Sequence, residues 1–209
     1  MSISVISWNM QGGVANNADK ELTLKTMCAL YDVVMVQECG TIATLNQFAG
    51  KSVIGSLQAG ALNNRCSVAI ITNKHSKYDI AYLSTSGRPI ISVLVGDVWL
   101  STIHATSGGI GGTDLTATLA YATKTLVGAD GKYLLGGDFN ILFNGEENCI
   151  NVGSSYRPDN YSLHTFKRRT HSSGASLDAF ASRALEIKSG PSVVVEKLSD
   201  HYPITTSIA

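Results

Sequence analysis

Acid, amide and histidine residues stand at the ends of several short apolar segments of this sequence. Asn9, Glu38 and His104 each follow such a segment, and Asp138 and Asn140 end a fourth. Strand ends along one edge of packed sheets converge, so we expect these five side chains to share a cleft. Any one of them, taken alone, is better explained as a polar residue that ends a strand. Five residues of metal-ligand or acid–base type in equivalent positions are harder to explain by packing.

Two short motifs add to this pattern. A Gly-Gly pair immediately precedes Asp138, and glycine allows another backbone to approach closely. Asp138 and Asn140 are two residues apart, so in an extended chain they face the same way. Near the C-terminal end, Asp200 and His201 stand together before a proline and a last apolar segment. Packing explains such an acid–histidine pair poorly, so we interpret it as functional.

The residue types indicate chemistry on a phosphate ester. Carboxylate and amide oxygens suit a hard divalent ion, Mg²⁺ before Zn²⁺, with Mn²⁺ or Ca²⁺ as alternatives. The histidines then remain available to move protons or to stabilise charge. Arg65 and Arg88 precede apolar segments and could clamp phosphate oxygens, although each is equally well explained as a surface arginine. The other histidines have no comparable context and are interpreted as solvent-exposed or loop residues: His75, His164 and His171.

Composition narrows the class of protein. The chain has 209 residues, of which 44% are apolar, and its 16 basic and 16 acidic residues cancel. These values argue against a disordered chain, a coiled coil and a strongly basic protein that coats polyanions. No apolar run approaches the roughly 20 residues that a membrane span needs. We expect one domain spanning residues 1–209.

The N-terminal residues and the cysteines bear on the cellular compartment. No basic and long apolar leader is visible at the start, so the sequence predicts no signal peptide and leaves the localisation unknown. The four cysteines show neither a CxxC motif nor zinc-like spacing and are interpreted as buried free thiols, with a Cys39–Cys66 disulfide as the alternative in a secreted chain.

Short β-branched segments predict a protein rich in strands. The ten predicted strands are 2–9, 32–38, 52–57, 66–72, 90–95, 98–104, 133–138, 176–182, 192–197 and 204–208. Helices are predicted at 20–30 with Asp19 as N-cap, at 42–48 with Thr41, and from Thr113 or Asp114 to about residue 126. Strands outnumber helices, which favours a four-layer α/β/β/α sandwich of two mixed sheets with helices outside. A long polar stretch, 143–171, contains the basic cluster 167–169, which is either a nucleic-acid contact or a solvated loop.

Taken in order, these motifs resemble the endonuclease/exonuclease/phosphatase superfamily, which has the deoxyribonuclease I-like fold. The matching motifs are Trp8-Asn9, Gln37-Glu38, His104, Gly137-Asp138-Phe139-Asn140, Leu177-Asp178 and Ser199-Asp200-His201. Within the superfamily the chain is most similar to the catalytic B subunits of cytolethal distending toxins. This narrower resemblance rests on the segments 7–12, 37–40, 64–71, 87–91, 104–109 and 170–178.

The resemblance implies a role for each matching residue. Glu38 would be the principal metal ligand, with Asn9 and Asp200 nearby in the metal and phosphate site. Asp178 would orient His201 and raise its basicity.

The remaining residues would act on water and phosphate. Asp138 and Asn140 would position the attacking water and the phosphate, and His104 would act near the leaving oxygen. Arg65 and Arg88 would hold substrate phosphates.

The function implied by the resemblance is divalent-metal-dependent hydrolysis of DNA phosphodiesters by an endonuclease, the catalytic subunit of a genotoxin. DNA backbone phosphates would be the substrate, toxin delivery subunits would be the partners, and a toxin-like chain would be secreted and delivered to the host cell nucleus. A phosphatase that uses the same site on inositol phospholipids is the alternative. A binding protein with an inactive site is disfavoured, because such a protein has no need for the complete set of polar residues.

Overall fold

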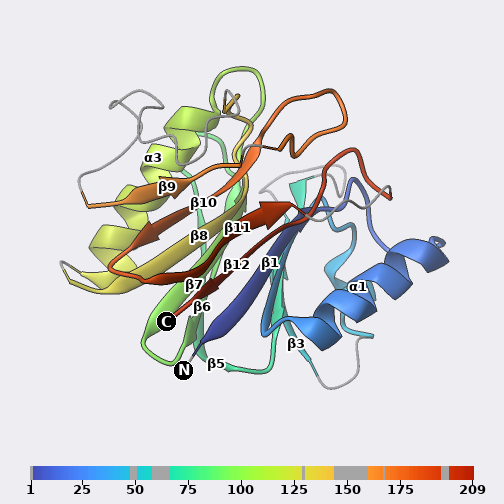
Figure 1. Cartoon of the computed structure of the whole chain (residues 1–209), viewed down its shortest axis with the longest axis horizontal. Helices are drawn as coiled ribbons and strands as arrows, with labels where there is room; N and C mark the ends of the chain where they lie inside the picture. Colours follow the sequence, from blue (N-terminus) through green and yellow to red (C-terminus); the bar gives the residue numbers. More distant parts are fainter. Residues whose placement is uncertain are drawn as a thin grey trace.

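The computed structural model describes residues 2–47, 51–57, 66–128, 130–143, 160–166, 168–193 and 198–209. In these residues two six-stranded sheets pack face to face, and helices cover the two outer sides (Figure 1). The predicted four-layer α/β/β/α sandwich of mixed sheets is therefore confirmed.

The first sheet contains both ends of the described chain. Its strands, in spatial order, are β11 (Ile187–Val193), β12 (Ile204–Ile208), β1 (Ile3–Asn9), β2 (Val33–Gln37), β4 (Val68–Thr72) and β3 (Ser52–Ser56). Only β1 and β2 run parallel among these neighbours, and the other neighbouring pairs are antiparallel.

The second sheet is built from the middle of the chain. Its strands, in spatial order, are β5 (His75–Tyr82), β6 (Pro89–Val95), β7 (Val98–His104), β8 (Lys132–Asp138), β10 (Asp178–Arg183) and β9 (Ser162–His164). Here β7 and β8 are the parallel pair.

The two parallel pairs carry the polar strand ends that the sequence singles out. In the first sheet the register pairs Asn9 with Gln37, the residue before Glu38. In the second sheet it pairs His104 with Asp138. Neighbouring parallel strands end at the same edge of a sheet, so each sheet brings two of these side chains to its own edge.

Strands buried on both faces explain the continuous apolar runs in the sequence. In β2, Val33 and Met35 enter the core between the two sheets, whereas Val34 and Val36 pack on the side of α1. This alternation gives each central strand two apolar faces. Consequently α1 (Ala18–Leu30) covers the outer face of the first sheet (Figure 1).

The outer face of the second sheet is covered in the same way. Leu115 and Leu119 of α3 (Gly111–Tyr121) pack with Leu135 of β8. The helix continues as a π-helical segment, η2 (Ala122–Val127), which ends at Gly128 with a left-handed φ of 63°. Among the described helices, none has the length and hydrophobicity that a membrane span requires.

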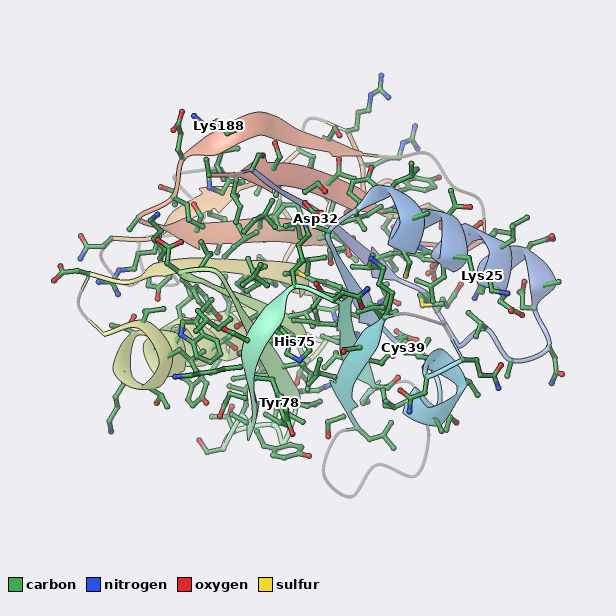
Figure 2. All side chains as sticks on the ribbon, turned by 90° about the horizontal axis from the view of Figure 1, so that it is seen from below. Lys25, Asp32, Cys39, His75, Tyr78 and Lys188 are labelled. Atoms are coloured by element: carbon green, nitrogen blue, oxygen red, sulfur yellow. The ribbon has the colours of Figure 1, made fainter. Side chains whose placement is uncertain are left out.

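Two strands and several boundaries differ from the sequence prediction. β5 was not predicted, because as an edge strand it exposes polar and aromatic residues in place of an apolar run; His75 and Tyr78 mark it in Figure 2. β9 is only three residues long and also lay outside the predicted set. β10 begins at Asp178 rather than at 176, and β11 spans Ile187–Val193 rather than 192–197, of which 194–197 lie outside the described residues.

The predicted helix caps are wrong in detail. Asn17, not Asp19, caps α1, and its side chain accepts from the backbone N–H of Lys20. Helix α2 spans only Ile42–Leu45, and the Thr41 side chain makes no capping hydrogen bond.

Helix α3 begins at Gly111, ahead of the predicted cap at Thr113 or Asp114. The reason is that Asp114 is fully buried and serves the neighbouring loop, where its Oδ2 accepts from the backbone N–H of Thr106 at 2.8 Å.

Three of the four cysteines are described, and they are free: Cys28, Cys39 and Cys66. The alternative Cys39–Cys66 disulfide is therefore not formed. Cys39 is buried directly after Glu38, where its thiol contacts the hydroxyl of Ser67 at 3.5 Å. Burial raises the pKa of the Cys39 thiol to about 11, so it is protonated near neutral pH.

Candidate active site

Asn9 connects the polar strand ends of the two sheets. Its Nδ2 donates to Asp138 Oδ2 at 3.0 Å and contacts Glu38 Oε1 at 3.4 Å. The orientation of this amide is set by the backbone N–H of Gln11, which donates to Asn9 Oδ1 at 3.0 Å. The amide nitrogen therefore faces the two carboxylates and holds them near each other, and a direct metal contact by Asn9 stays a prediction.

Three residues of the site have left-handed backbone conformations that favour glycine. The φ angles are 49° at Gln11, 47° at Glu38 and 50° at Asn140. Such conformations cost roughly 1–3 kcal/mol for a residue with a side chain, and they cluster at functional sites. At Glu38 and Asn140 the strain falls just after strands β2 and β8, where the chain turns the side chains toward the common edge.

His201 and Asp178 form a buried pair at this edge. His201 Nδ1 donates to Asp178 Oδ2 at 2.9 Å, and both side chains are almost fully buried. The indole N–H of Trp8 donates to the backbone carbonyl of His201 at 3.3 Å, which fixes the main chain. His201 Nε2 then lies 3.6 Å from Asp138 Oδ2.

Electrostatics favours the protonated form of His201. Burial alone would lower its pKa, but the carboxylates of Asp178, Asp138 and Asp200 outweigh burial and raise it to about 9.

His104 approaches the same carboxylate from the second sheet. Its Nε2 lies 3.6 Å from Asp138 Oδ2 and 3.7 Å from Glu38 Oε1. On the other side of the ring, Nη1 of Arg88 lies 3.3 Å from Nδ1. A guanidinium can only donate, so His104 Nδ1 must accept and the ring carries its proton on Nε2. Arg88, predicted to hold substrate phosphate, is thus also placed to fix the tautomer of His104.

Asp138 is the central carboxylate of the site. Its Oδ1 accepts from the backbone N–H of Asn140 at 2.9 Å, and its Oδ2 faces both histidines. Burial and the nearby charge of Asp178 raise the pKa of Asp138, while His201 and His104 oppose that shift. Asn140 is anchored by its Nδ2, which donates to the carbonyl of Ala105 at 2.8 Å.

Asp200 joins the site through two residues that sequence reasoning did not single out. Gln11 Nε2 donates to Asp200 Oδ2 at 2.7 Å, and His171 Nε2 lies 3.4 Å from the same oxygen. The His171 ring also packs edge-to-face on His201, with centroids 4.7 Å apart. His171 does lie in the loop between β9 and β10, as interpreted, but its ring belongs to the site, which the sequence did not indicate. The segment 170–178 contributed only to the resemblance, and it was the one sequence signal that could have found this residue.

The other predicted residues lie elsewhere. His75 and His164 are on strands β5 and β9 rather than in loops, and His164 Nε2 bonds to Ser182 Oγ at 2.7 Å. Burial lowers the pKa of His164. Arg65 falls outside the described residues, so its predicted contact with phosphate stays a prediction.

The donor set of the site fits a hard divalent cation. Three carboxylates converge with an amide where the ends of the two sheets meet: Glu38, Asp138, Asp200 and Asn9. Two overlapping groups of acids and histidines have ligand atoms close enough to hold a metal ion: His171, Asp200 and His201, and Asp138, Asp178 and His201. Oxygen-rich donor sets of this kind favour Mg²⁺, Mn²⁺ or Ca²⁺.

Solved structures show the same architecture. The cytolethal distending toxin of Actinobacillus actinomycetemcomitans matches with a TM-score of 0.72 at 20% identity, over 98% of this chain and 97% of that chain. CdtB, described as the biologically active subunit of cytolethal distending toxin, matches with a TM-score of 0.72 at 17% identity. The match covers 99% of this chain and 97% of that chain. The chain has the deoxyribonuclease I-like fold.

The same fold is found in TDP2 of D. rerio. Its structure in complex with a single-strand DNA product has a TM-score of 0.71 and 17% identity, over 100% of this chain and 99% of that chain. No protein-family model and no curated protein matches the sequence. The deoxyribonuclease I-like fold is thus shared with these structures at low identity, and the activity must be argued from the site itself.

Proposed function

We propose that this chain is a divalent-metal-dependent phosphodiesterase that cleaves DNA as an endonuclease. The observation that carries the proposal is the convergence of two histidines on one carboxylate oxygen. His104 Nε2 and His201 Nε2 each lie 3.6 Å from Asp138 Oδ2; His104 reaches it from the end of β7 and His201 from the loop before β12. Two histidines held around one carboxylate suit a reaction that both takes up and delivers a proton.

The metal is proposed to be Mg²⁺, with Mn²⁺ or Ca²⁺ as substitutes. Glu38 would be its principal ligand, with Asp200 and Asn9 nearby. When bound, such a cation neutralises phosphate charge and favours attack by water. Glu38 follows β2 and Asp200 lies in the loop before β12, far apart in the chain, so the chain must be folded before these carboxylates can bind a metal together.

The partners of the two histidines give them different tasks. Asp178 accepts from His201 Nδ1, so His201 takes up a proton on Nε2, and the carboxylates that raise its pKa to about 9 make it a strong base for a proton from water once it is deprotonated. Arg88 donates to His104 Nδ1, so the Nε2 of His104 carries a proton that it can give to the leaving oxygen. We therefore assign His201 as general base and His104 as general acid.

DNA is the proposed substrate. In support, TDP2 of D. rerio, which shares the fold, is described in complex with a single-strand DNA product. The described part of the basic cluster, Arg168 and Arg169, is exposed and directly precedes Thr170. Thr170 lies close to His201, because its carbonyl accepts a hydrogen bond from the backbone N–H of the next residue, Tyr202. The cluster is thus suited to contact phosphates on either side of the cleaved bond.

Relaxation of supercoiled plasmid tests the proposal. We expect nicking with Mg²⁺, none with EDTA, and a loss of about 10²–10⁴-fold in rate for His201→Ala. His164→Ala is the matched control, because His164 lies on β9 and bonds to Ser182. Intact plasmid at high enzyme concentration would refute the nuclease, and release of phosphate from inositol phospholipids would then identify the same site as a phosphatase.

A role as the catalytic subunit of a genotoxin is proposed on the similarity to the toxin structures. Such a chain would be secreted, assembled with delivery subunits and carried to the host nucleus. Introducing the purified chain into nuclei should produce DNA breaks in a comet assay, and His201→Ala should produce none. Equal breaks from both proteins would refute this role.

A further inference from the structure

Gln11 makes four hydrogen bonds near the site, and no catalytic step uses it. Its side chain pairs reciprocally with Asp200: Nε2 donates to Oδ2 at 2.7 Å, and Oε1 accepts from the Asp200 backbone N–H at 3.3 Å. Its own N–H fixes the amide of Asn9. Gln11 thus joins the loop after β1 to the loop before β12 and controls the orientation of two predicted metal-site residues.

The backbone of Gln11 is held in place from behind. Lys20, a buried residue of α1, donates from Nζ to the carbonyl oxygens of Gln11 at 3.1 Å and Met10 at 2.5 Å. The left-handed φ of 49° at Gln11 is maintained by these bonds. Gln11 is hydrogen-bonded through its N–H, its carbonyl and its side chain. These bonds hold the strained residue in one orientation.

His171 reaches the same carboxylate from the opposite side. The backbone N–H of Ser173 donates to His171 Nδ1 at 3.1 Å, so this nitrogen is an acceptor and the N–H of the ring is on Nε2. That Nε2 lies 3.4 Å from Asp200 Oδ2. The backbone adds to the connection, because Ser172 N–H donates to the Asp200 carbonyl at 2.7 Å.

We propose that Gln11 and His171 are positioning residues that clamp the Asp200 carboxylate between them, with His171 Nε2 facing Asp200 Oδ2. The clamp sets how well the preorganised site binds its divalent cation and leaves the proton transfers to His104 and His201. This inference rests on the proposed function, because it takes Asp200 as part of the metal and phosphate site.

Binding of Mn²⁺ alone provides the first test, because it requires no catalysis. Free Mn²⁺ is measured by electron paramagnetic resonance with wild type, Gln11→Met and His171→Phe. Loss of a partner that orients a ligand typically weakens metal affinity about 10–100-fold, so we expect at least a tenfold weaker Mn²⁺ affinity for both variants. Gln47→Met is the matched control, since Gln47 is an exposed glutamine just after α2. Thermal melting of each variant establishes that it is folded.

A second substitution at His171 tests whether the site needs a hydrogen-bond donor there or only a ring of that size. The amide nitrogen of glutamine can replace the imidazole Nε2–H, so His171→Gln should retain near wild-type Mn²⁺ affinity where His171→Phe does not. In plasmid cleavage, Gln11→Met and His171→Phe should raise the Mg²⁺ concentration for half-maximal rate while kcat at saturating Mg²⁺ stays near wild type. Nitrogen-15 NMR of the imidazole should show the Nε2–H tautomer of His171 in metal-free protein.

The clamp is overturned if folded Gln11→Met and His171→Phe bind Mn²⁺ as wild type does. It is also overturned if His171→Gln is as defective as His171→Phe, or if NMR finds the proton of His171 on Nδ1. These outcomes are distinct from a failure of the proposed function. A wild-type chain that binds Mn²⁺ through the clamp but leaves plasmid intact would refute the nuclease and leave the clamp standing.

Discussion

At the scale of single residues, the chemistry of the site depends on which ring nitrogen each histidine presents. His104 and His201 are placed symmetrically around Asp138, yet their second nitrogens face a cation and an anion respectively. Sequence reasoning identified both histidines but could not rank them, because tautomers depend on contacts between residues far apart in the chain. Asp178 and His201 are separated by 23 positions, and only the fold brings them to 2.9 Å.

The Asp178–His201 pair predicts a specific pH dependence. The pKa of His201 is about 9 in the metal-free protein, above its ordinary value near 6.5, because burial is outweighed by carboxylates of which Asp178 is the first. A raised folded-state pKa stabilises the fold fully below pH 6.5, and this contribution is lost as pH rises through about 9. In Asp178→Asn the pKa of His201 should fall, because one fewer carboxylate then opposes the lowering effect of burial.

Proton NMR of the imidazole Cε1–H between pH 5 and 10, in EDTA, measures this shift. Asp97→Asn is the control, because Asp97 is exposed and paired with Lys132 away from the site. An unchanged pKa of His201 in Asp178→Asn would contradict the electrostatic account. A second consequence is kinetic: a misoriented His201 should reduce plasmid nicking about 10²–10⁴-fold.

Arg88 provides a separate test of the general acid. Arg88→Met removes the donor to His104 Nδ1 and frees the ring to place its proton on either nitrogen. We expect kcat to fall at least about tenfold, and by no more than the 10²–10⁴-fold that a general acid typically contributes. The loss should shrink when the DNA substrate is replaced by a bridging phosphorothiolate, whose sulfur leaves without protonation. An equal loss on both substrates would assign Arg88 to phosphate binding alone.

At the scale of elements, β7 and β8 are held in register by the close approach of their backbones. A Cβ built on Gly137 of β8 would lie 2.2 Å from the carbonyl oxygen of Ile103 on β7. These strands carry His104 and Asp138 opposite each other. The Gly-Gly pair predicts that another backbone approaches closely, and in the structure that backbone belongs to Ile103.

Gly137→Ala should therefore separate β7 from β8. We expect a loss of stability of at least about 1–3 kcal/mol, the usual cost of overpacking, together with weaker nicking. Gly108→Ala is the comparison, because its added Cβ meets no atom within 4 Å and only its left-handed φ of 79° is strained. Urea denaturation measures the free energy of unfolding of both variants. An equal loss of stability in the two would mean that backbone strain, not the contact with Ile103, destabilises Gly137→Ala.

The strands that position the site were predictable, whereas the loops between them were not. β1, β2, β7 and β8 are buried on both faces, so their apolar runs are long and their polar ends conspicuous. His171 and Gln11 lie in loops with no periodic pattern, and their partner Asp200 is 189 positions away from Gln11. A local sequence pattern cannot report such contacts. The edge strand β5 was missed for the complementary reason, because solvent on one side removes the need for an apolar run.

At the scale of the whole molecule, a chain with no net charge must bind DNA through a local group of cations. Arg168 and Arg169 are the exposed basic residues closest in sequence to the catalytic edge among the described part of the loop 168–177. Each phosphate contact on duplex DNA contributes about 0.9 to the slope of log affinity against log salt. Replacing both arginines with glutamine should therefore reduce the slope by about 1.8 and weaken binding uniformly across DNA sequences.

The matched control is the pair Lys25→Gln and Lys188→Gln, which changes the total charge equally at two exposed ion pairs (Figure 2). Fluorescence anisotropy with a catalytically inactive His201→Ala background measures binding between about 50 and 200 mM salt. Hydrolysis of a small phosphodiester should be unchanged in the arginine variant, because such a substrate has no flanking phosphates. Equal salt slopes for the two double variants would mean that general charge, rather than this loop, attracts DNA. A loss of activity on the small substrate would instead place the arginines within the catalytic site, where the reacting phosphate itself is held.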